Sequence, residues 1–104
     1  MNYVNLIGKM SSEPKFLQLE DGQKVVNFTL STQEPYLDKT GQPKIKKYWH
    51  KMTAWGNWVN IIEHQASKGT NIAIEGRLTT RFYQDTKGVK KSISEVEIND
   101  LSII

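Results

Sequence analysis

The sequence predicts a mainly β protein, a closed antiparallel barrel of five strands with one α-helix between the third and fourth. Apolar and polar residues alternate with period two over most of the 104 residues, as they do in half-buried strands. Only residues 57–69 change to helical spacing. Gly, Asp and Pro residues separate the alternating segments, and no repeat or linker interrupts them. We therefore expect a single domain over residues 1–104.

The composition narrows the class of protein. Hydrophobic residues make up 38% of the chain and charged residues 24%, which is typical of globular rather than disordered proteins. No apolar run approaches the ~20 residues that a membrane helix needs, and the N-terminus lacks the features of a secretory signal. The absence of cysteine excludes disulfide and thiolate chemistry. These features predict a cytoplasmic protein without a membrane contact.

The first half of the chain contains the expected strands 2–8 and 25–32, with a hairpin over 15–24 between them. The hairpin turns at Asp21-Gly22, a dipeptide that favours tight β-turns. Residues 33–44 contain two prolines and a glycine, so we predict a loop there.

A long strand and the only helix follow. Residues 45–55 alternate as a strand, whereas residues 57–69 space their apolar side chains as a helix of about three turns. Asn57 is the expected N-cap and Gly69 the expected C-terminal stop. Trp58 lies on the apolar stripe of this helix, so we predict that it belongs to the core.

The last third of the chain returns to strands. Residues 70–85 and 92–104 alternate again, and a lysine-rich turn around Gly88 joins them. Ile93 is out of phase with the apolar residues that follow it, which predicts a bulge or a bend nearby. Five long strands with a single helix before the fourth are typical of the OB-fold barrel, and this is the architecture that we expect.

One face of the strand 45–55 has an unusual chemistry. Alternation places Trp49, Lys51 and Trp55 on the same side. A lysine between two tryptophans suits neither a core nor an ordinary solvent-exposed surface. His50 lies on the other side with apolar neighbours, so we predict a packed or interfacial histidine rather than a metal ligand.

The strand 70–85 carries a second set of the same kind. Arg77, Arg81 and Tyr83 share the face opposite the apolar residues, and Tyr36 offers a further aromatic ring in the predicted loop. Interleaved aromatic and basic residues suit a single-stranded nucleic acid, because bases stack on rings and phosphates attract cations. Each of these side chains, taken alone, also fits an ordinary core, surface or protein-interface position.

The net charge of +3 is only mildly basic, but the lysines gather in two segments. Residues 34–51 contain five lysines against two acids, and residues 87–91 contain three lysines and no acid. We expect these segments to form basic arms that reach for phosphates. The sequence shows no metal-ligand spacing, nucleophile arrangement or phosphate-binding glycine loop, so we predict no enzyme, no metal and no cofactor.

Four stretches of the chain resemble one family. "NLIGKMSSEP" and "VVNFTLST" are similar to the opening strands of bacterial single-stranded DNA-binding proteins. "YWHKMTAWGN" is similar to the family's aromatic-Trp-His-basic segment, and "SKGTNIAIEGRLTTRFYQD" to its helix end, Lys-Gly turn and following strand. Together they cover nearly the whole chain. The resemblance implies an OB fold that binds and protects single-stranded DNA without sequence preference in replication, recombination and repair.

The resemblance also implies roles for particular residues. The base-stacking aromatics fall on Tyr36, Trp49, Trp55 and Tyr83. The basic contacts fall on Lys51, Arg77, Arg81 and Lys68, to which the lysine-rich segments add Lys46, Lys47, Lys90 and Lys91. The subunit contacts of a homotetramer, or at least a homodimer, fall on Tyr3, Val4, Leu6 and His50.

Two other functions stay open at this point. An RNA-binding or replication-restart OB protein would prefer ribo-oligomers. A protein-interaction OB module would use the aromatic face to dock a partner. The family usually continues into a flexible tail with an acidic tip that recruits replication and repair enzymes, whereas this sequence ends at "NDLSII". We therefore make no prediction for such enzymes, and the resemblance implies a cytoplasmic, nucleoid-associated protein.

Overall fold

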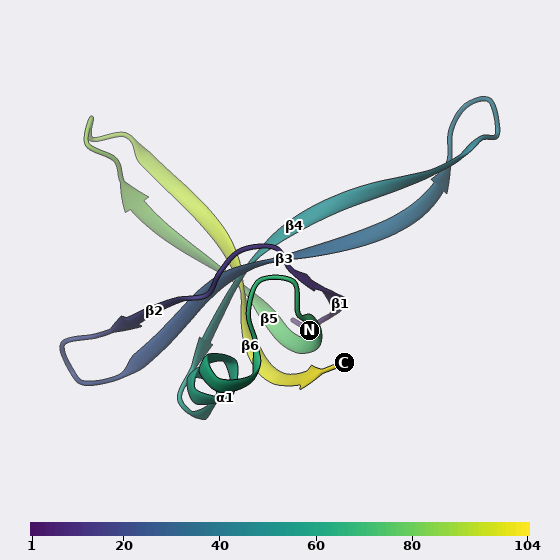
Figure 1. The fold of residues 1–104 in the computed structure, drawn as a ribbon. Helices are drawn as coiled ribbons and strands as arrows, with labels where there is room; N and C mark the ends of the chain where they lie inside the picture. The colour runs from purple at the N-terminus through teal and green to yellow at the C-terminus, as the bar shows by residue number, and fades with distance from the viewer.

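The computed structural model describes all residues from 1 to 104 and contains six strands and one helix (Figure 1). The strands are β1 (Val4–Met10), β2 (Lys15–Gln18), β3 (Lys24–Leu37), β4 (Pro43–Trp55), β5 (Asn71–Gln84) and β6 (Lys90–Ile103), and the helix is α1 (Asn57–Gln65). The mainly β prediction is confirmed.

Five of the strands close into a barrel in the order β1-β5-β6-β4-β3, and β1 completes it by pairing with β3. β2 lies outside and pairs only with β3. The helix precedes the fourth barrel strand, as predicted, but the entirely antiparallel arrangement is wrong at one seam: β4 and β6 are parallel, with Met52 beside Val96. A parallel pair needs a long crossover connection, and α1 and β5 together provide it.

The core fills the barrel with aliphatic and aromatic side chains from all five barrel strands and from α1. Its members are Met10, Val26, Phe28, Leu30, Met52, Ala54, Val59, Ile62, Ile72, Ile74, Val96, Ile98 and Leu101. Their burial removes apolar surface from water, which is the main favourable term in folding. Trp58 of α1 packs against this cluster while still partly exposed, in line with its predicted place.

Two glycines let the barrel strands approach closely. A Cβ atom on Gly8 would lie 2.2 Å from the carbonyl oxygen of Ser31, and one on Gly76 would lie 2.2 Å from that of Glu97. Any side chain would therefore force the backbones apart, and only glycine fits. Gly8 lies at the point where β1 passes from β5 to β3 and closes the barrel.

Two hairpins extend far beyond the barrel as two-stranded ribbons, at the upper right and upper left of Figure 1. We call them the β3–β4 arm (residues 32–49) and the β5–β6 arm (residues 77–95). The loop predicted for residues 33–44 is wrong, because β3 and β4 continue through most of it. Each strand of an isolated ribbon is an edge strand and tolerates proline where its nitrogen faces outward, so Pro35 and Pro43 do not interrupt it.

Both arms end in the same five-residue turn, Asp38–Gln42 in one and Asp85–Val89 in the other. The N–H of each aspartate donates to the carbonyl of the fifth residue at 3.0 Å, and the glycine in fourth place has a positive φ of 82° or 78°. Each carboxylate accepts N–H groups from the third and fifth residues at 2.9 Å. Each also pairs with a lysine two residues beyond the turn, Lys44 at 3.7 Å and Lys91 at 3.4 Å.

The same contacts set the protonation of the two aspartates. The hydroxyl of Thr40 and the backbone N–H of Gln42 lower the pKa of Asp38 below its ordinary value of 3.8. The backbone N–H of Val89 lowers the pKa of Asp85 in the same way. Both turns are therefore stabilised by charged carboxylates, although neither turn packs against the core.

The ends of the helix differ from the prediction. α1 stops at Gln65 rather than at residue 69, and its N-cap is Gly56, without a side-chain cap bond from Asn57. Gly69, with φ of 98°, lies in the following turn, where its N–H donates to the carbonyl of Met10 at 2.8 Å. This hydrogen bond holds the turn before β5 against the end of β1.

The last two strands also correct two expectations. The register irregularity of β6 falls opposite Gly76, where Asn99 is the extra residue, and not near Ile93. Ile93 is out of phase because it faces the outside of the barrel rather than the core. Leu78 and Phe82 alternate in phase with the buried Ile72 and Ile74, which predicts burial, but they are 50% and 80% exposed because β5 leaves the barrel beyond Gly76.

Candidate nucleic-acid interface

The two aromatic and basic stretches lie on one continuous surface. Directly opposed residues of neighbouring strands project to the same side of a sheet. Thr53 of β4 lies beside Glu97 of β6, which in turn pairs with Arg77 of β5, so one face runs across all three strands. We call this outer face the platform; it carries Lys47, Trp49, Lys51 and Trp55 of β4, Arg77, Arg81 and Tyr83 of β5, and Lys91 of β6.

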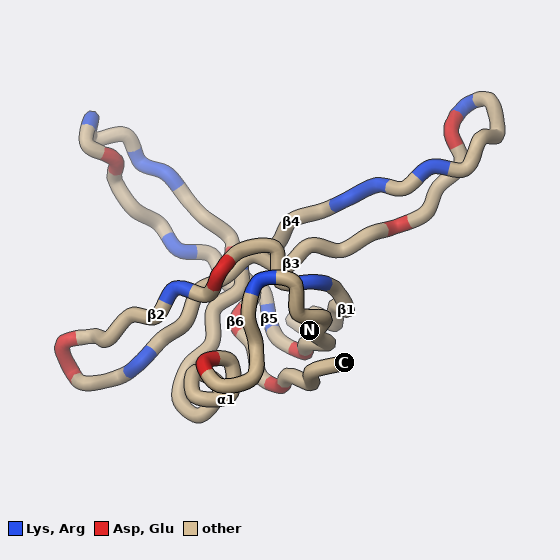
Figure 2. The backbone as a smooth tube through the Cα atoms, viewed as in Figure 1, with Lys and Arg blue, Asp and Glu red and all other residues tan.

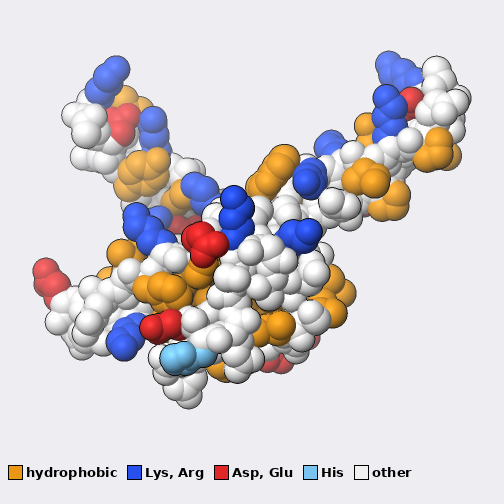
Figure 3. Space-filling model, viewed as in Figure 1, with side chains coloured by type: hydrophobic (Ala, Val, Ile, Leu, Met, Phe, Trp, Pro, Cys, Tyr) orange, Lys and Arg blue, Asp and Glu red, His pale blue; other side chains and the backbone are white.

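The aromatic rings of the platform are accessible. Trp49, Trp55 and Tyr83 expose 63%, 38% and 45% of their surface. Tyr83 lies out on the β5–β6 arm, opposite Lys91. In the space-filling view, hydrophobic and basic side chains are interspersed along both arms (Figure 3). Large exposed rings among cations are typical of a binding surface rather than of a core.

A shallow hollow joins the two halves of the platform at the feet of the arms. It is lined by Asn27, Phe28 and Thr29 of β3, Lys51 and Met52 of β4, Arg81 of β5, and Ile93 and Glu95 of β6. A polymer that passes from one arm to the other along the platform would cross Lys51 and Arg81.

Tyr36 lies on the opposite side of the β3–β4 arm from the platform tryptophans. The register pairs Tyr36 with Lys44 and Thr32 with Tyr48, whereas Trp49 pairs with Ser31. Because side chains alternate along a strand, the tyrosine and Trp49 point away from each other. Tyr36, expected only as a further aromatic ring in a loop, therefore does not share the face of Trp49 and Trp55.

Tyr48 is a further aromatic side chain on that opposite side of the arm. The Nζ atom of Lys46 lies 5.3 Å from the centre of the Tyr48 ring, within cation–π range, and the ring stacks on His50 with centroids 6.5 Å apart. Tyr48 was not predicted as a site residue, although it is next to Trp49 in the sequence. Because a loop was expected at 33–44, the sequence did not show that Tyr48 and Tyr36 lie on the same side of one ribbon.

The four residues expected at a subunit interface have different environments. Val4 and Leu6 of β1 are partly buried against the core of their own barrel. Tyr3 faces outward, and its hydroxyl donates to Glu75 at 2.6 Å, a bond that raises the pKa of Tyr3. His50 is half-buried and shares a hydrogen bond of 2.9 Å with the hydroxyl of Thr32. The outward-facing apolar residue of β1 is Ile7, which is 67% exposed.

The basic residues of the platform fall into two groups. On the β5–β6 arm every one has a carboxylate partner: Arg77 with Glu97 at 3.2 Å, Arg81 with Glu95 at 2.8 Å and Lys91 with Asp85 at 3.4 Å. Lys47 and Lys51 of β4 have none. Figure 2 shows blue segments along β4 in the β3–β4 arm, a red segment on β3, and one blue and one red segment side by side at the tip.

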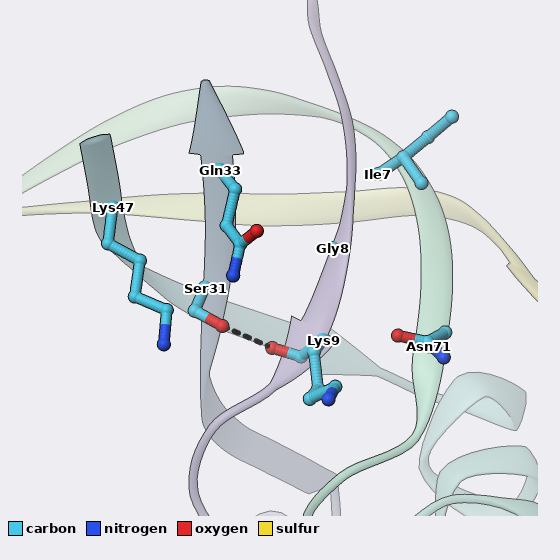
Figure 4. A pocket seen from close by; sticks show the side chains of 7 residues that line it. All are labelled: Ile7, Gly8, Lys9, Ser31, Gln33, Lys47 and Asn71. Atoms are coloured by element: carbon cyan, nitrogen blue, oxygen red, sulfur yellow. Dashed lines mark hydrogen bonds between the residues drawn. The ribbon is translucent and has the colours of Figure 1, made fainter. Parts of the chain in front are cut away.

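A second hollow lies at the foot of the β3–β4 arm (Figure 4). Lys9 of β1 and Lys47 of β4 enter it together with Gln33, Asn71 and Ser31, whose hydroxyl donates to the Lys9 carbonyl at 3.3 Å. Neither lysine is ion-paired. Lys9 was not predicted as a site residue, since it lies just beyond the expected strand 2–8 and comes near Lys47 only because β1 pairs with β3.

The remaining predicted basic residues lie off the platform. Lys68 belongs to the turn before β5, where its backbone N–H donates to Glu13 at 3.2 Å. Lys90 pairs in register with Gln84, on the side of the β5–β6 arm opposite to Tyr83. No group of three or more His, Asp or Glu side chains is placed to hold a metal ion. The helix is neither long nor apolar enough to cross a membrane.

Fold and surface together define an OB-fold protein with an aromatic and basic platform on the outside of its barrel. The chain belongs to the single-strand binding protein family, whose sequence model matches residues 1–104. It is 38% identical over 105 residues to single-stranded DNA-binding protein 1 of Chlorobaculum tepidum and 28% identical over 104 residues to the single-stranded DNA-binding protein of Neisseria meningitidis. Each match covers all of this chain but 65% and 60% of the relative.

Solved structures agree with the family assignment. The fold superposes with a TM-score of 0.92 on a Plasmodium falciparum SSB in complex with ssDNA, at 31% identity over 100% of this chain and 95% of the other. A deletion mutant of the single-stranded DNA binding protein from Thermus aquaticus superposes with a TM-score of 0.88, at 26% identity over 100% of this chain and 50% of the other. The OB-fold prediction is therefore confirmed.

Proposed function

We propose that this chain binds single-stranded DNA without sequence preference and catalyses no reaction. The observation that carries the proposal is the platform itself, on which Trp49 and Trp55 are exposed on either side of the unpaired Lys51. Membership of the single-strand binding protein family and the likeness to an SSB in complex with ssDNA support it.

The spacing of the rings fits a polymer better than a small ligand. Trp49 and Trp55 are six residues apart on β4, which corresponds to roughly 20 Å at the rise of a strand. They would therefore hold separate bases along a path. Every base has a π-face, so stacking tolerates any sequence; it contributes ~1–3 kcal/mol per base, a value that comes from single-strand binders of this type.

The wider role follows from the family rather than from the platform. We propose that the complete protein protects single-stranded DNA in replication, recombination and repair inside the cell, as a homotetramer or at least a homodimer. The outward side chains of Ile7 in β1 and of Tyr3 just before it offer a surface for such assembly.

Tryptophan fluorescence during titration with dT oligomers tests the proposal. Stacking of bases on Trp49 and Trp55 should quench emission to saturation, with a midpoint that weakens as salt rises. Trp49→Phe and Trp55→Phe should each lose part of the quenching, whereas Trp58→Phe, a control beside the core, should keep it. Absence of quenching at micromolar DNA would favour a protein-docking face, and tighter binding of ribo-oligomers would favour an RNA-binding protein.

A further inference from the structure

The two arms differ in whether the cations on their platform side are ion-paired. This difference affects which part of a bound nucleotide each arm would contact. Arg77, Arg81 and Lys91 of the β5–β6 arm are each paired with a carboxylate. Lys47 and Lys51 on the β3–β4 side have no such partner, and Lys9 joins Lys47 in the hollow at the foot of that arm. The unpaired cations thus cluster on one side of the platform.

The pairing of Arg81 is the most complete. Both Nε and Nη2 of its guanidinium donate to the same oxygen of Glu95, at 3.0 and 2.8 Å. The side chain of Arg81 is 68% exposed, whereas that of Glu95 is only 15% exposed. The carboxylate therefore lies beneath the arginine, on the floor of the hollow that it shares with Lys51.

Arg77 is arranged in the same way. Its Nη2 atom donates to Glu97 at 3.2 Å, and the side chains are 55% and 31% exposed, respectively. Glu95 and Glu97 are two residues apart on β6 and project to the same side, so two carboxylates lie in a row along the platform. A phosphate that displaced either carboxylate from its arginine would leave that mostly covered carboxylate unpaired, beside the negative charge of the phosphate.

A charge-balanced arginine contributes little to counterion release. The salt dependence of binding measures how many phosphates are neutralised, with log K changing by about 0.7 per contact on single strands for each unit of log salt. Lys9, Lys47 and Lys51 should contribute to this number, whereas Arg77 and Arg81 should not. The planar guanidinium of a paired arginine still offers a flat surface on which a base can stack.

We propose that Glu95 and Glu97 keep phosphates off the β5–β6 half of the platform, so that the strand turns its bases toward that half. Phosphates then follow Lys9, Lys47 and Lys51, while Tyr83 and the paired arginines contact bases. This inference rests on the proposed binding of single-stranded DNA. It confines the phosphate contacts to the β3–β4 half, where Trp49 and Trp55 also stack bases, and leaves only base contacts on the β5–β6 half.

The test is the slope of log K against log salt for a dT oligomer, measured by tryptophan quenching. We expect Lys51→Gln to lower the slope by about 0.7 and Arg81→Gln to leave it unchanged. Glu95→Gln frees Arg81 and should raise the slope by about 0.7 with tighter binding at low salt. Glu63→Gln, which removes an exposed acid from α1, is the matched control for net charge and should not change the slope.

The double variant Arg81→Gln with Glu95→Gln keeps the local charge balance and should return the wild-type slope, even if Glu95→Gln alone fails to fold. An Arg81→Gln slope as shallow as that of Lys51→Gln, or an unchanged slope in Glu95→Gln, would overturn the division of the platform while DNA binding stands. Failure of the wild-type chain to bind dT at all would instead overturn the proposed function, and the division with it.

Discussion

The β3–β4 and β5–β6 arms share a backbone design and differ in their surfaces. Both are two-stranded ribbons that leave the same barrel, and both end in an Asp-x-x-Gly-x turn with a lysine two residues beyond it. Yet one presents unpaired lysines and tryptophan to the platform, and the other presents tyrosine and ion-paired arginines. The comparison teaches that the ribbon fixes where side chains point, while cross-strand partners decide whether a cation is available.

Neither arm has a hydrophobic core of its own, so residues along the arms contribute little to the stability of the fold and remain free to bind a ligand. An isolated hairpin is at best marginally stable in water. Here each arm continues a strand pair whose barrel half is buried, and its far end is closed by a charged aspartate. Substitutions on the arms should therefore change the affinity for the ligand more than the stability of the fold. Substitutions where the arms join the barrel should change the stability more than the affinity.

The largest effect on binding should come from removing both tryptophans of β4. Trp49→Ala with Trp55→Ala deletes two stacking contacts and should weaken dT binding by about 2–6 kcal/mol, if each contributes the ~1–3 kcal/mol usual for such rings. Filter binding or anisotropy with a labelled oligomer would measure this, since fluorescence quenching is lost. An affinity within twofold of wild type would contradict the assigned role of β4.

The next effect concerns the feet of the arms. Gly76→Ala and Gly8→Ala each push a Cβ atom against a backbone carbonyl and should destabilise the barrel by about 1–3 kcal/mol. Urea unfolding measures the loss. Thr80→Ala, an exposed change within the β5–β6 arm, is the control and should stay within about 0.5 kcal/mol of wild type. Equal stability of Gly76→Ala and this control would show that the close approach of strands is not required.

A smaller effect should separate the two faces of the ribbons. Tyr83→Ala should weaken binding of a short dT oligomer by about 1 kcal/mol, the lower end of the stacking range, because a phenol ring offers less area than an indole. Tyr36→Ala, on the other side of the β3–β4 arm, should leave short oligomers unaffected and weaken only longer ones. Calorimetric titration with two oligomer lengths distinguishes these outcomes; a loss for Tyr36→Ala with the short oligomer would place both rings on one path.

The smallest effect should appear at acid pH in the two turns. The folded-state pKa values of Asp38 and Asp85 are below 3.8, so their stabilising contribution is present above that value and is lost as pH falls through the folded-state pKa. Backbone amides of Thr40 and Val89 should then exchange faster relative to core amides, as NMR hydrogen exchange would measure. Asp38→Asn should remove this pH dependence in one arm only, and persistence of the dependence in that arm would exclude the aspartate as its cause.

Much of the platform was predictable because it depends on local alternation. Period two alone placed Trp49, Lys51 and Trp55 on one side of β4, and the helical spacing after residue 56 gave the single helix its position in the strand order. The side of Tyr36 could not be predicted in this way. The prolines in 33–44 suggested a loop, so alternation was not extended to Tyr36, although β3 continues through it.

The sequence by itself determined the class of barrel, the helix and the faces of the long strands, since these follow from spacing between near neighbours. Only the tertiary structure decided that β4 and β6 run parallel, that Lys9 meets Lys47, and that Glu95 neutralises Arg81 across 14 residues of chain. Such pairs form because barrel closure fixes strand order and register, and no local pattern contains that information. The sequence therefore determines which aromatic and basic side chains the platform carries, whereas the fold determines which of its cations are left without a carboxylate partner.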